Sequence, residues 1–236
     1  MYGTLYLIPC PISDETAPWD VLPAANRAVM DSLDYFIVEN TRSARRFLSK
    51  AGIARPIDTL EFRELNEHTV AGREVEELVK PLVEGRSAGV VSEAGVPGVA
   101  DPGALVVEAC HRHGIRVVPL VGPSSVILAV MASGLNGQSF AFNGYLPVKP
   151  PERVQAIRRF ERRAQSERQS QLFIEAPYRN AKLLEQLLQV LAPDTRLTLA
   201  VDLTAPGGQV TTRTVAEWRR APLPELNKRP AIFIIG

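Results

Sequence analysis

The sequence of 236 residues is poor in cysteine and histidine, which restricts the sites it can form. Cys10 and Cys110 are too few for a disulfide framework, and their spacing matches no metal-binding motif. His111 and His113 lie near the end of a predicted helix and point to different faces, and His68 is isolated. We therefore expect no metal site, and the scarcity of cysteine favours a protein of the reducing cytoplasm.

Long hydrophobic runs and an excess of charge of one sign are also lacking. No uncharged apolar segment reaches the roughly 18–20 residues that cross a bilayer, and residues 1–11 lack the basic start of a signal peptide. We therefore expect no membrane association. The 27 Lys and Arg and 26 Asp and Glu give a net charge of +1, so a nucleic-acid or membrane partner would require a local patch.

Strand-like apolar runs alternate with longer amphipathic stretches in the first half of the chain. The predicted strands are 5–8, 35–38, 57–62, 88–91 and 116–120. The predicted helices are 20–32, 43–51, 70–84 and 104–113. This βαβ series predicts a parallel sheet that is covered by helices on both faces.

After residues 121–123 the pattern changes, and antiparallel pairing becomes more prominent. Helices are predicted at 124–133, 152–168 and 179–191, and strands at 140–143, 171–175, 196–202 and 231–235. A hairpin is predicted around Gly207-Gly208. We therefore expect two α/β domains, 1–120 with a mainly parallel sheet and 121–236 with a mixed sheet, with a cleft between them.

The loop after the 88–91 strand is rich in turn-forming residues. Three glycines and two prolines occur within residues 92–103, and Asp101-Pro102 predicts a helix start, with Asp as N-cap and Pro at the first helical position. Such loops at the carboxyl ends of parallel strands bind ligands in open α/β sheets. We therefore expect a binding loop, although an ordinary strand-to-helix connection is the alternative.

The common nucleotide-binding patterns are absent. No P-loop pattern with its Lys-Ser/Thr occurs, and no G-x-G-x-x-G follows the first strand. Glu39, after the second strand, precedes the glycine loop, whereas the ribose-binding acid of a Rossmann domain follows it. These observations argue against a nucleoside triphosphate, a standard dehydrogenase and a Rossmann-type methyltransferase.

Six short motifs nevertheless occur in an order that is typical of one family. They are Val-Glu-Asn-Thr-Arg (38–42), Val-Ser-Glu-Ala-Gly-Val-Pro (91–97), Asp-Pro-Gly (101–103), Gly-Pro-Ser-Ser (122–125), Gly-Tyr-Leu-Pro (144–147) and Glu-Ala-Pro-Tyr-Arg (175–179). The chain resembles the tetrapyrrole methylase-fold (class III) methyltransferases, which use S-adenosylmethionine. It is most similar to the branch that methylates a ribose 2′-hydroxyl in bacterial small-subunit ribosomal RNA, and the resemblance covers nearly the whole chain.

The resemblance implies a two-domain α/β homodimer that binds S-adenosylmethionine in the interdomain cleft. By motif match, the methyl donor would contact Pro9, Ser92, Glu93, Ala94, Gly95, Val96, Val99, Ser124 and Ser125. From the second domain, Ala176, Leu203, Pro230 and Ala231 would close over its adenine and ribose. The donor carries no phosphate, so small residues and backbone groups suit it better than a P-loop.

The chain departs from that branch at several motif positions. The branch usually has Asp at the positions of Asn40 and Glu93, Thr at that of Val96, and Ser-Pro-His-Arg where this chain has 176–179. These departures leave open the interpretation that the chain is a shorter paralogue with a different methyl acceptor. RNA ribose is the leading acceptor, and a tetrapyrrole or other small molecule and a non-catalytic cofactor-binding protein are the alternatives.

A ribose hydroxyl is a weak nucleophile, so a general base would assist its methylation. Glu39 is the leading candidate because it stands at a strand end, and Arg42, one short turn away, is the second predicted catalytic residue. An ion pair with Arg42 or Arg45 is the structural alternative for Glu39. The rival carboxylates are Glu93, Asp101, for which a helix N-cap is the favoured role, and Glu175.

Basic residues cluster locally despite the small net charge. One cluster comprises Arg42, Arg45, Arg46 and Lys50, and a second comprises Arg153, Arg158, Arg159, Arg162, Arg163 and Arg168. Such clusters suit RNA phosphates, with Tyr145 or Tyr178 for base stacking. The alternative is a solvated helix face, because Glu152, Glu161 and Glu167 are interleaved, and a carboxylate-rich tetrapyrrole would also attract arginines.

Overall fold

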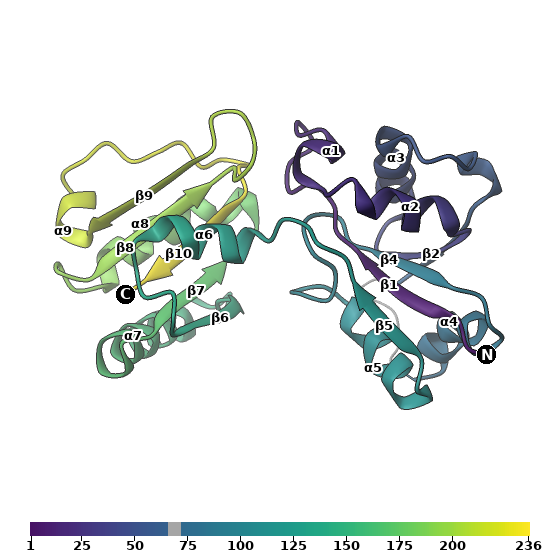
Figure 1. Cartoon of the computed structure of the whole chain (residues 1–236). Coiled ribbons are helices and arrows are strands. Elements are labelled where there is room, and N and C mark those ends of the chain that lie inside the picture. The colour runs from purple at the N-terminus through teal and green to yellow at the C-terminus, as the bar shows by residue number, and fades with distance from the viewer. Residues whose placement is uncertain (66–71) are drawn as a thin grey trace. The chain divides into compact units, whose positions relative to one another are not determined.

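The computed structural model describes residues 1–65 and 72–236 and divides into two compact units, Met1–Ser124 and Ser125–Gly236 (Figure 1). The division falls a few residues after position 120, where the sequence predicts the first domain to end. Ser124 and Ser125 therefore belong to different units. Each unit is built on its own five-stranded sheet.

The sheet of the first unit is parallel throughout, with strand order β3-β2-β4-β1-β5. Its strands are β1 (Thr4–Ile8), β2 (Tyr35–Val38), β3 (Glu61–Glu64), β4 (Ala88–Val91) and β5 (Arg116–Pro119). β2 and β4 are buried along their whole length, as expected for strands covered on both faces. A Cβ at Gly89 would lie 2.6 Å from Cδ1 of Ile8, so a larger residue in β4 would have to displace this buried side chain.

Helices pack on both faces of this sheet. They are α1 (Pro18–Val21), α2 (Ala25–Ser32), α3 (Thr41–Ala51), α4 (Arg73–Val83) and α5 (Gly103–His113), with a 3-10 turn, η1 (Ile57–Thr59). Leu82 of α4 and Val106 of α5 pack into the core on one face. Met30 of α2 and Leu48 of α3 pack into the core on the other. The predicted parallel sheet with helices on both faces is therefore what the first unit forms.

The sheet of the second unit is mixed, with strand order β6-β7-β10-β8-β9. Its strands are β6 (Phe140–Tyr145), β7 (Ser170–Ile174), β8 (Arg196–Val201), β9 (Gln209–Thr214) and β10 (Ala231–Ile235). Only the β6–β7 pair is parallel; the pairs that β10 forms with β7 and β8, and β8 with β9, are antiparallel. The predicted hairpin is the β8–β9 connection, in which Gly207 has a φ of +83°.

The helices of the second unit also divide between two faces. They are α6 (Ser125–Ser133), α7 (Pro150–Glu167), α8 (Asn180–Val190) and α9 (Val215–Trp218), with a 3-10 turn, η2 (Pro177–Arg179). Ile157 of α7 and Leu184 of α8 belong to one core cluster, and Val126 and Ala129 of α6 belong to the other. Each unit therefore has its own two-sided core.

Three predicted elements differ in the structure. The helix predicted at 20–32 is two helices, because Leu22 precedes Pro23 and adopts an extended conformation that ends α1. The strand predicted at 57–62 is η1 followed by β3, which begins where Glu61 pairs with Tyr35 of β2. Residues 70 and 71 of the helix predicted at 70–84 lie outside the described residues, and α4 begins at Arg73.

Candidate active site

The loops that follow β1 and β4 meet at one edge of the first sheet. The backbone N–H of Cys10 donates to the carbonyl oxygen of Gly95 at 2.8 Å. The Cys10 thiol donates to the carbonyl oxygen of Ser92 at 3.4 Å, and burial raises the pKa of this thiol. The loop after β5 also reaches this edge, since a Cβ on Gly122 would lie 2.3 Å from Cγ of Pro9. Three loops that are far apart in the sequence are thus in direct contact.

The glycine loop after β4 presents small residues and backbone to solvent. Ser92 is buried, and its hydroxyl donates to the carbonyl oxygen of Ala94 at 3.3 Å. Glu93 and Ala94 are exposed, whereas Gly95 is buried. Gly95 and Gly98 have φ values of +71° and +82°, which glycine adopts without strain. Of the further predicted contacts in this unit, Val96 and Ser124 are half-buried and Val99 is exposed.

Asp101 holds this loop together. Its Oδ1 accepts hydrogen bonds from the backbone N–H groups of Gly98 and Gly103, both at 2.7 Å. Its Oδ2 is buried without a hydrogen-bond partner, and burial raises the pKa of the carboxyl group. The prediction of Asp101 as N-cap is wrong by one residue, because α5 begins at Gly103 with Pro102 as the N-cap. Asp101 nevertheless satisfies the first N–H of that helix.

Glu39 follows the last residue of β2 and is half-buried. Burial and the neighbouring carboxylates of Asp101 and Glu93 raise its pKa to about 7, while a hydrogen bond from the backbone N–H of Glu93 opposes the rise. Glu39, Ser92 and Asp101 line the same narrow gap at the carboxyl ends of β2 and β4. A carboxylate with a pKa near neutrality is suited to accept a proton.

The structure does not support an ion pair as the role of Glu39. Arg45 pairs instead with Asp58. Arg42 is exposed in the first turn of α3, and within residues 1–65 and 72–236 neither arginine forms an ion pair with Glu39. The turn is fixed by Asn40, whose side chain accepts a hydrogen bond from the N–H of Ser43 at 3.0 Å. A catalytic role for Arg42 stays a prediction.

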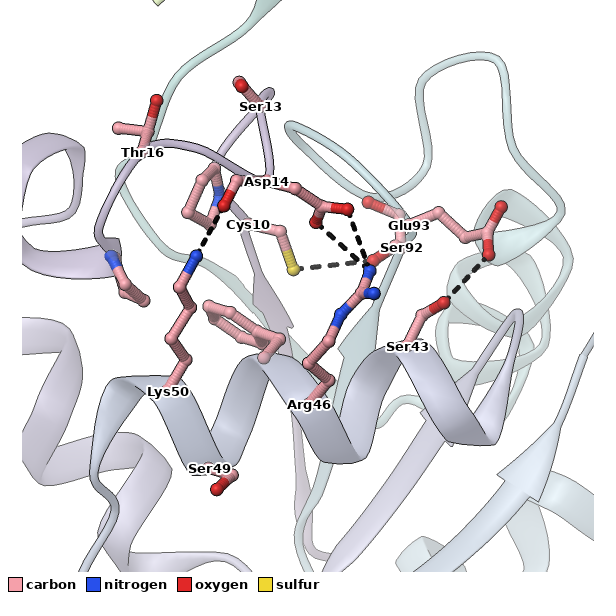
Figure 2. A pocket seen from close by; sticks show the side chains of 13 residues that line it. Cys10, Ser13, Asp14, Thr16, Ser43, Arg46, Ser49, Lys50, Ser92 and Glu93 are labelled. Atoms are coloured by element: carbon pink, nitrogen blue, oxygen red, sulfur yellow. Dashed lines mark hydrogen bonds and ion pairs between the residues drawn. The ribbon is translucent and has the colours of Figure 1, made fainter. Parts of the chain in front are cut away.

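A pocket of about 460 Å³ lies beside the glycine loop, between the loop after β1 and helix α3 (Figure 2). The guanidinium of Arg46 pairs with the Asp14 carboxylate at 3.0 Å, and the Lys50 ammonium donates to the Asp14 carbonyl oxygen at 2.5 Å. The hydroxyl of Ser43 donates to Oε1 of Glu93 at 3.2 Å. The pocket therefore combines hydroxyl groups with both signs of charge, next to the predicted cofactor loop.

The sequence predicts only part of this pocket. Arg46 and Lys50 were expected in a basic cluster, and Ser92 and Glu93 were expected to contact the methyl donor. Asp14 and Phe47 were not anticipated. The spacing of residues 43, 46, 47 and 50 on one face of a helix could have indicated a shared surface. The sequence does not show that the loop after β1 packs opposite this surface, because that contact depends on tertiary packing.

The predicted donor contacts of the second unit also collect at one sheet edge. Ala176 follows β7, Leu203 follows β8, and Pro230 precedes β10. Because β10 runs antiparallel to both β7 and β8, its start lies beside their ends, and Ala231 pairs with Val201. Ser125 opens α6 and is half-buried. Ala176, Leu203, Pro230 and Ala231 thus lie at one edge of the second sheet.

Glu175 is not an accessible base in this structure. Its Oε1 lies 2.5 Å from Nη2 of Arg179, and its Oε2 lies 3.7 Å from Nη1 of Arg153. The side chain is only 1% exposed. This carboxylate, a rival to Glu39 in the sequence analysis, is enclosed between two arginines beside Ala176. Its position indicates a structural role at the end of β7.

Within residues 1–65 and 72–236, no three His, Cys, Asp or Glu side chains are grouped as a metal ion would require. His68 lies outside these residues. No helix in the described part of the chain combines the length and the apolar character needed to span a membrane.

Comparison with known proteins relates this arrangement to a family. The chain is 33% identical over 233 residues to "Ribosomal RNA small subunit methyltransferase I" of Xylella fastidiosa (strain Temecula1 / ATCC 700964), covering 99% of this chain and 80% of the relative. A relative with the same name from Vibrio cholerae is 34% identical over 200 residues. That match covers 85% of this chain and 65% of the relative, just under two thirds of its length.

Solved structures with the same fold are more distant in sequence. The methyltransferase CobJ superposes with a TM-score of 0.64 at 18% identity, covering 99% of this chain and 94% of that chain. Uroporphyrin-III-C-methyltransferase from Thermus thermophilus has a TM-score of 0.55 at 20% identity, covering 100% and 93%. These likenesses confirm the prediction of two α/β domains of this fold.

The family described as "Tetrapyrrole (Corrin/Porphyrin) Methylases" matches residues 5–218, which is most of the chain. The prediction of a methyltransferase is thus confirmed at the level of the family. The predicted resemblance to the branch that acts on ribosomal RNA is confirmed by the names of the relatives. The chain belongs to the tetrapyrrole methylase family.

Proposed function

We propose that this protein transfers a methyl group from S-adenosylmethionine to a ribose 2′-hydroxyl of small-subunit ribosomal RNA. The observation that carries the choice of acceptor is the 33% identity, over 99% of the chain, to a protein named as a small-subunit ribosomal RNA methyltransferase. The likenesses to CobJ and uroporphyrin methyltransferase, at 18% and 20% identity, support the fold and not a tetrapyrrole acceptor.

The glycine loop fits the proposed methyl donor. S-adenosylmethionine has no phosphate, and its amino acid, ribose and adenine parts need hydrogen-bonding groups and small neighbours. The small side chain of exposed Ala94 leaves the backbone of the loop accessible, and the close contact of Gly122 with Pro9 leaves no room for a larger side chain there. In this proposal the donor is held by Pro9, Ser92, Glu93, Ala94, Gly95, Val96, Val99 and Ser124.

Residues of the second unit complete the proposed donor site. Ser125, Ala176, Leu203, Pro230 and Ala231 are the proposed contacts for its adenine and ribose. The donor supplies an electrophilic methyl carbon on a sulfonium, so that a neutral thioether leaves after transfer.

Glu39 is the proposed general base. Its pKa of about 7 allows an appreciable ionised fraction at neutral pH together with useful basicity. Glu39 would accept the proton of the 2′-hydroxyl as the oxygen bonds to the methyl carbon and the carbon–sulfur bond breaks. Arg42, exposed on the first turn of α3, is proposed to bind the acceptor near this carboxylate.

A two-part experiment tests the proposal. Calorimetry should detect binding of S-adenosylmethionine to the intact chain, and failure to bind would contradict the cofactor assignment. The protein and radiolabelled donor would then be incubated with small ribosomal subunits that lack the modification. Label in a ribose of the RNA supports the proposal, label only in small molecules would assign another acceptor, and no label anywhere would indicate a non-catalytic protein.

Glu39→Gln provides the test of the base, with Glu64→Gln as a matched control at the end of the adjacent strand β3. Glu39→Gln should lose methyl transfer while still binding the donor, with an affinity lowered only by the loss of one negative charge near the sulfonium, whereas the control should retain both binding and transfer. Equal activity of the two variants would exclude Glu39 as the base.

We also propose that the protein acts as a homodimer in the cytoplasm, where ribosomal subunits are assembled. Ile127 and Met131, one turn apart on α6, are 47% and 74% exposed. Large apolar side chains exposed together are typical of surfaces that another protein covers. Light scattering after size exclusion would measure the mass, and a monomer at micromolar concentration would contradict this proposal.

A further inference from the structure

We infer that the outer face of α7 binds the phosphate backbone of RNA. The inference rests on the proposed RNA acceptor and assigns a contact surface for it on the second unit. Helix α7 spans 18 residues, Pro150–Glu167, and packs one side against the sheet. Its buried residues recur at helical spacing and are Arg153, Ala156, Ile157, Phe160 and Ala164.

The opposite side of α7 carries three exposed arginines. Arg158, Arg159 and Arg162, together with Gln155, line a shallow pocket of about 510 Å³ that Pro147 and Glu152 border. Glu152 is the one carboxylate among the residues lining this pocket, and Lys149 approaches it to 3.4 Å. The residues that line the pocket therefore carry more positive than negative charge.

Other charged residues of α7 are engaged elsewhere. Arg153 is buried against Glu175, and Arg163 lies 3.4 Å from Glu167. Glu161 turns to the next loop, where its Oε1 accepts hydrogen bonds from the backbone N–H of Ala192 and the hydroxyl of Thr195. The interleaved glutamates therefore do not neutralise the arginine face, contrary to the alternative raised from the sequence.

The three arginines of the face remain available for an anion. In the described part of the chain, no carboxylate lies within 4.0 Å of Arg158, Arg159 or Arg162. Like charges one turn apart repel one another, and the repulsion is relieved by a bound anion. The guanidinium of Arg159 lies 5.0 Å from the centre of the Phe160 ring, which restricts its orientation.

The spacing of these residues suits a linear polyanion. Arg158 and Arg162 are separated by one helical turn, a rise of about 6 Å along the axis. Guanidinium groups bind phosphate through two parallel hydrogen bonds, and successive groups along a helix can contact successive phosphates of one strand. No base-reading arrangement is needed, so we expect contacts that position the RNA without selecting its sequence.

The test compares two triple variants of the intact protein. Arg158→Gln/Arg159→Gln/Arg162→Gln removes the arginine face while keeping residues of good helix propensity. Lys182→Gln/Arg196→Gln/Arg220→Gln removes the same charge from exposed positions elsewhere on the second unit. The probe is an unmodified transcript of small-subunit ribosomal RNA, and its dissociation constant is measured from 0.05 to 0.5 M salt.

Counterion release sets the expected size of the effect. Each phosphate contact with a single strand contributes about 0.7 to the slope of log K against log salt. Loss of three contacts should make the slope less steep by about 2 and weaken binding at 0.1 M salt by about 100-fold. The control variant should leave the slope close to that of the wild type. Equal slopes and affinities for the two triple variants would overturn the inference.

Two further measurements separate this inference from the proposed function. Binding of S-adenosylmethionine should be the same in wild type and both variants, which shows that the fold is intact. If the wild type binds RNA through these arginines but methylates none of it, the proposed function fails and the inference stands. If the arginine variant loses affinity for anionic vesicles but not for RNA, the inference is refuted in favour of a membrane surface.

Discussion

Replacing Glu39 with glutamine should stabilise the protein at alkaline pH while removing its proposed catalytic base. Glutamine keeps the size of the side chain, and its carbonyl oxygen can still accept the hydrogen bond from the N–H of Glu93. It carries no charge at any pH. The variant therefore isolates the effect of placing a negative charge at the end of β2.

The sign of the effect follows from the direction of the pKa change. Burial, with Asp101 and Glu93 adding to it, raises the pKa of Glu39 from 4.5 to about 7 in the folded protein. Below pH 4.5 the carboxyl group is protonated in both folded and unfolded chains, so its ionisation costs no stability. Between pH 4.5 and 7 the unfolded chain releases this proton while the folded chain retains it, so stability falls over this range, and the loss is complete once the folded state also ionises above pH 7.

The size of the effect is limited by partial solvation. The full pKa difference would correspond to about 3 kcal/mol of unfolding free energy. Because Glu39 is only half-buried, we expect Glu39→Gln to gain about 1–2 kcal/mol over the wild type at pH 8 and close to nothing at pH 4.5. Urea unfolding of both proteins at the two pH values would measure this difference.

For a control carboxylate whose pKa is lowered, we expect the opposite dependence of stability on pH. Glu64 at the end of β3 accepts a hydrogen bond from the N–H of Thr41, and this bond lowers its pKa. Its charge therefore favours folding above its unfolded pKa, and Glu64→Gln should gain no stability at pH 8. A Glu39→Gln variant that is destabilised equally at both pH values would refute the reasoning. So would a pH-dependent gain of the same size in Glu64→Gln.

Catalysis, packing and thiol reactivity give the remaining predictions. If Glu39 is the base, kcat/KM should rise with pH around a midpoint near 7 and fall about 10²–10⁴-fold in Glu39→Gln, and a flat profile would exclude it. Gly103→Ala should cost about 1–3 kcal/mol in urea unfolding, because its Cβ would lie 2.8 Å from Oδ1 of Asp101. Gly137→Ala, with its nearest contact at 3.6 Å, is the matched control and should cost far less. Burial raises the pKa of the Cys10 and Cys110 thiols, so iodoacetamide at pH 8 should alkylate both in urea and neither in the native protein by mass spectrometry.

The elements that the sequence predicts best are the buried strands, because their burial can be read directly from an unbroken run of apolar residues. β2 and β4 are continuous apolar runs, as expected of strands that are covered on both faces. Both have the predicted bounds. The break between α1 and α2 was missed although Pro23 contains the signal, because the amphipathic pattern continues across it. Local patterns thus identified strands better than the interruptions of helices.

The site is less predictable because its properties depend on long-range contacts. The order of the motifs placed Glu39 and the glycine loop among the candidates, but the raised pKa of Glu39 depends on its burial and on Asp101 and Glu93, far along the chain. The same limit applies to α7, where periodicity cannot show that Arg153 is enclosed with Glu175 while Arg158 is exposed. Sequence spacing indicates which residues share a face of a helix, but tertiary packing determines whether that face is buried against the protein or exposed to solvent.

The net charge of +1 conceals a separation of charge that suits the two proposed ligands. S-adenosylmethionine carries a positive sulfonium, whereas RNA is a polyanion, so one uniformly basic surface would attract the acceptor and disfavour the donor. The edge of the first sheet carries Glu39, Glu93 and Asp101, and Arg158, Arg159 and Arg162, which have no carboxylate within 4.0 Å in the described part of the chain, lie on α7 of the second unit. A cation bound near Glu39 would also favour its ionised form. The donor would then help to prepare the base, and its loss of charge after methyl transfer would weaken its hold on the carboxylate edge.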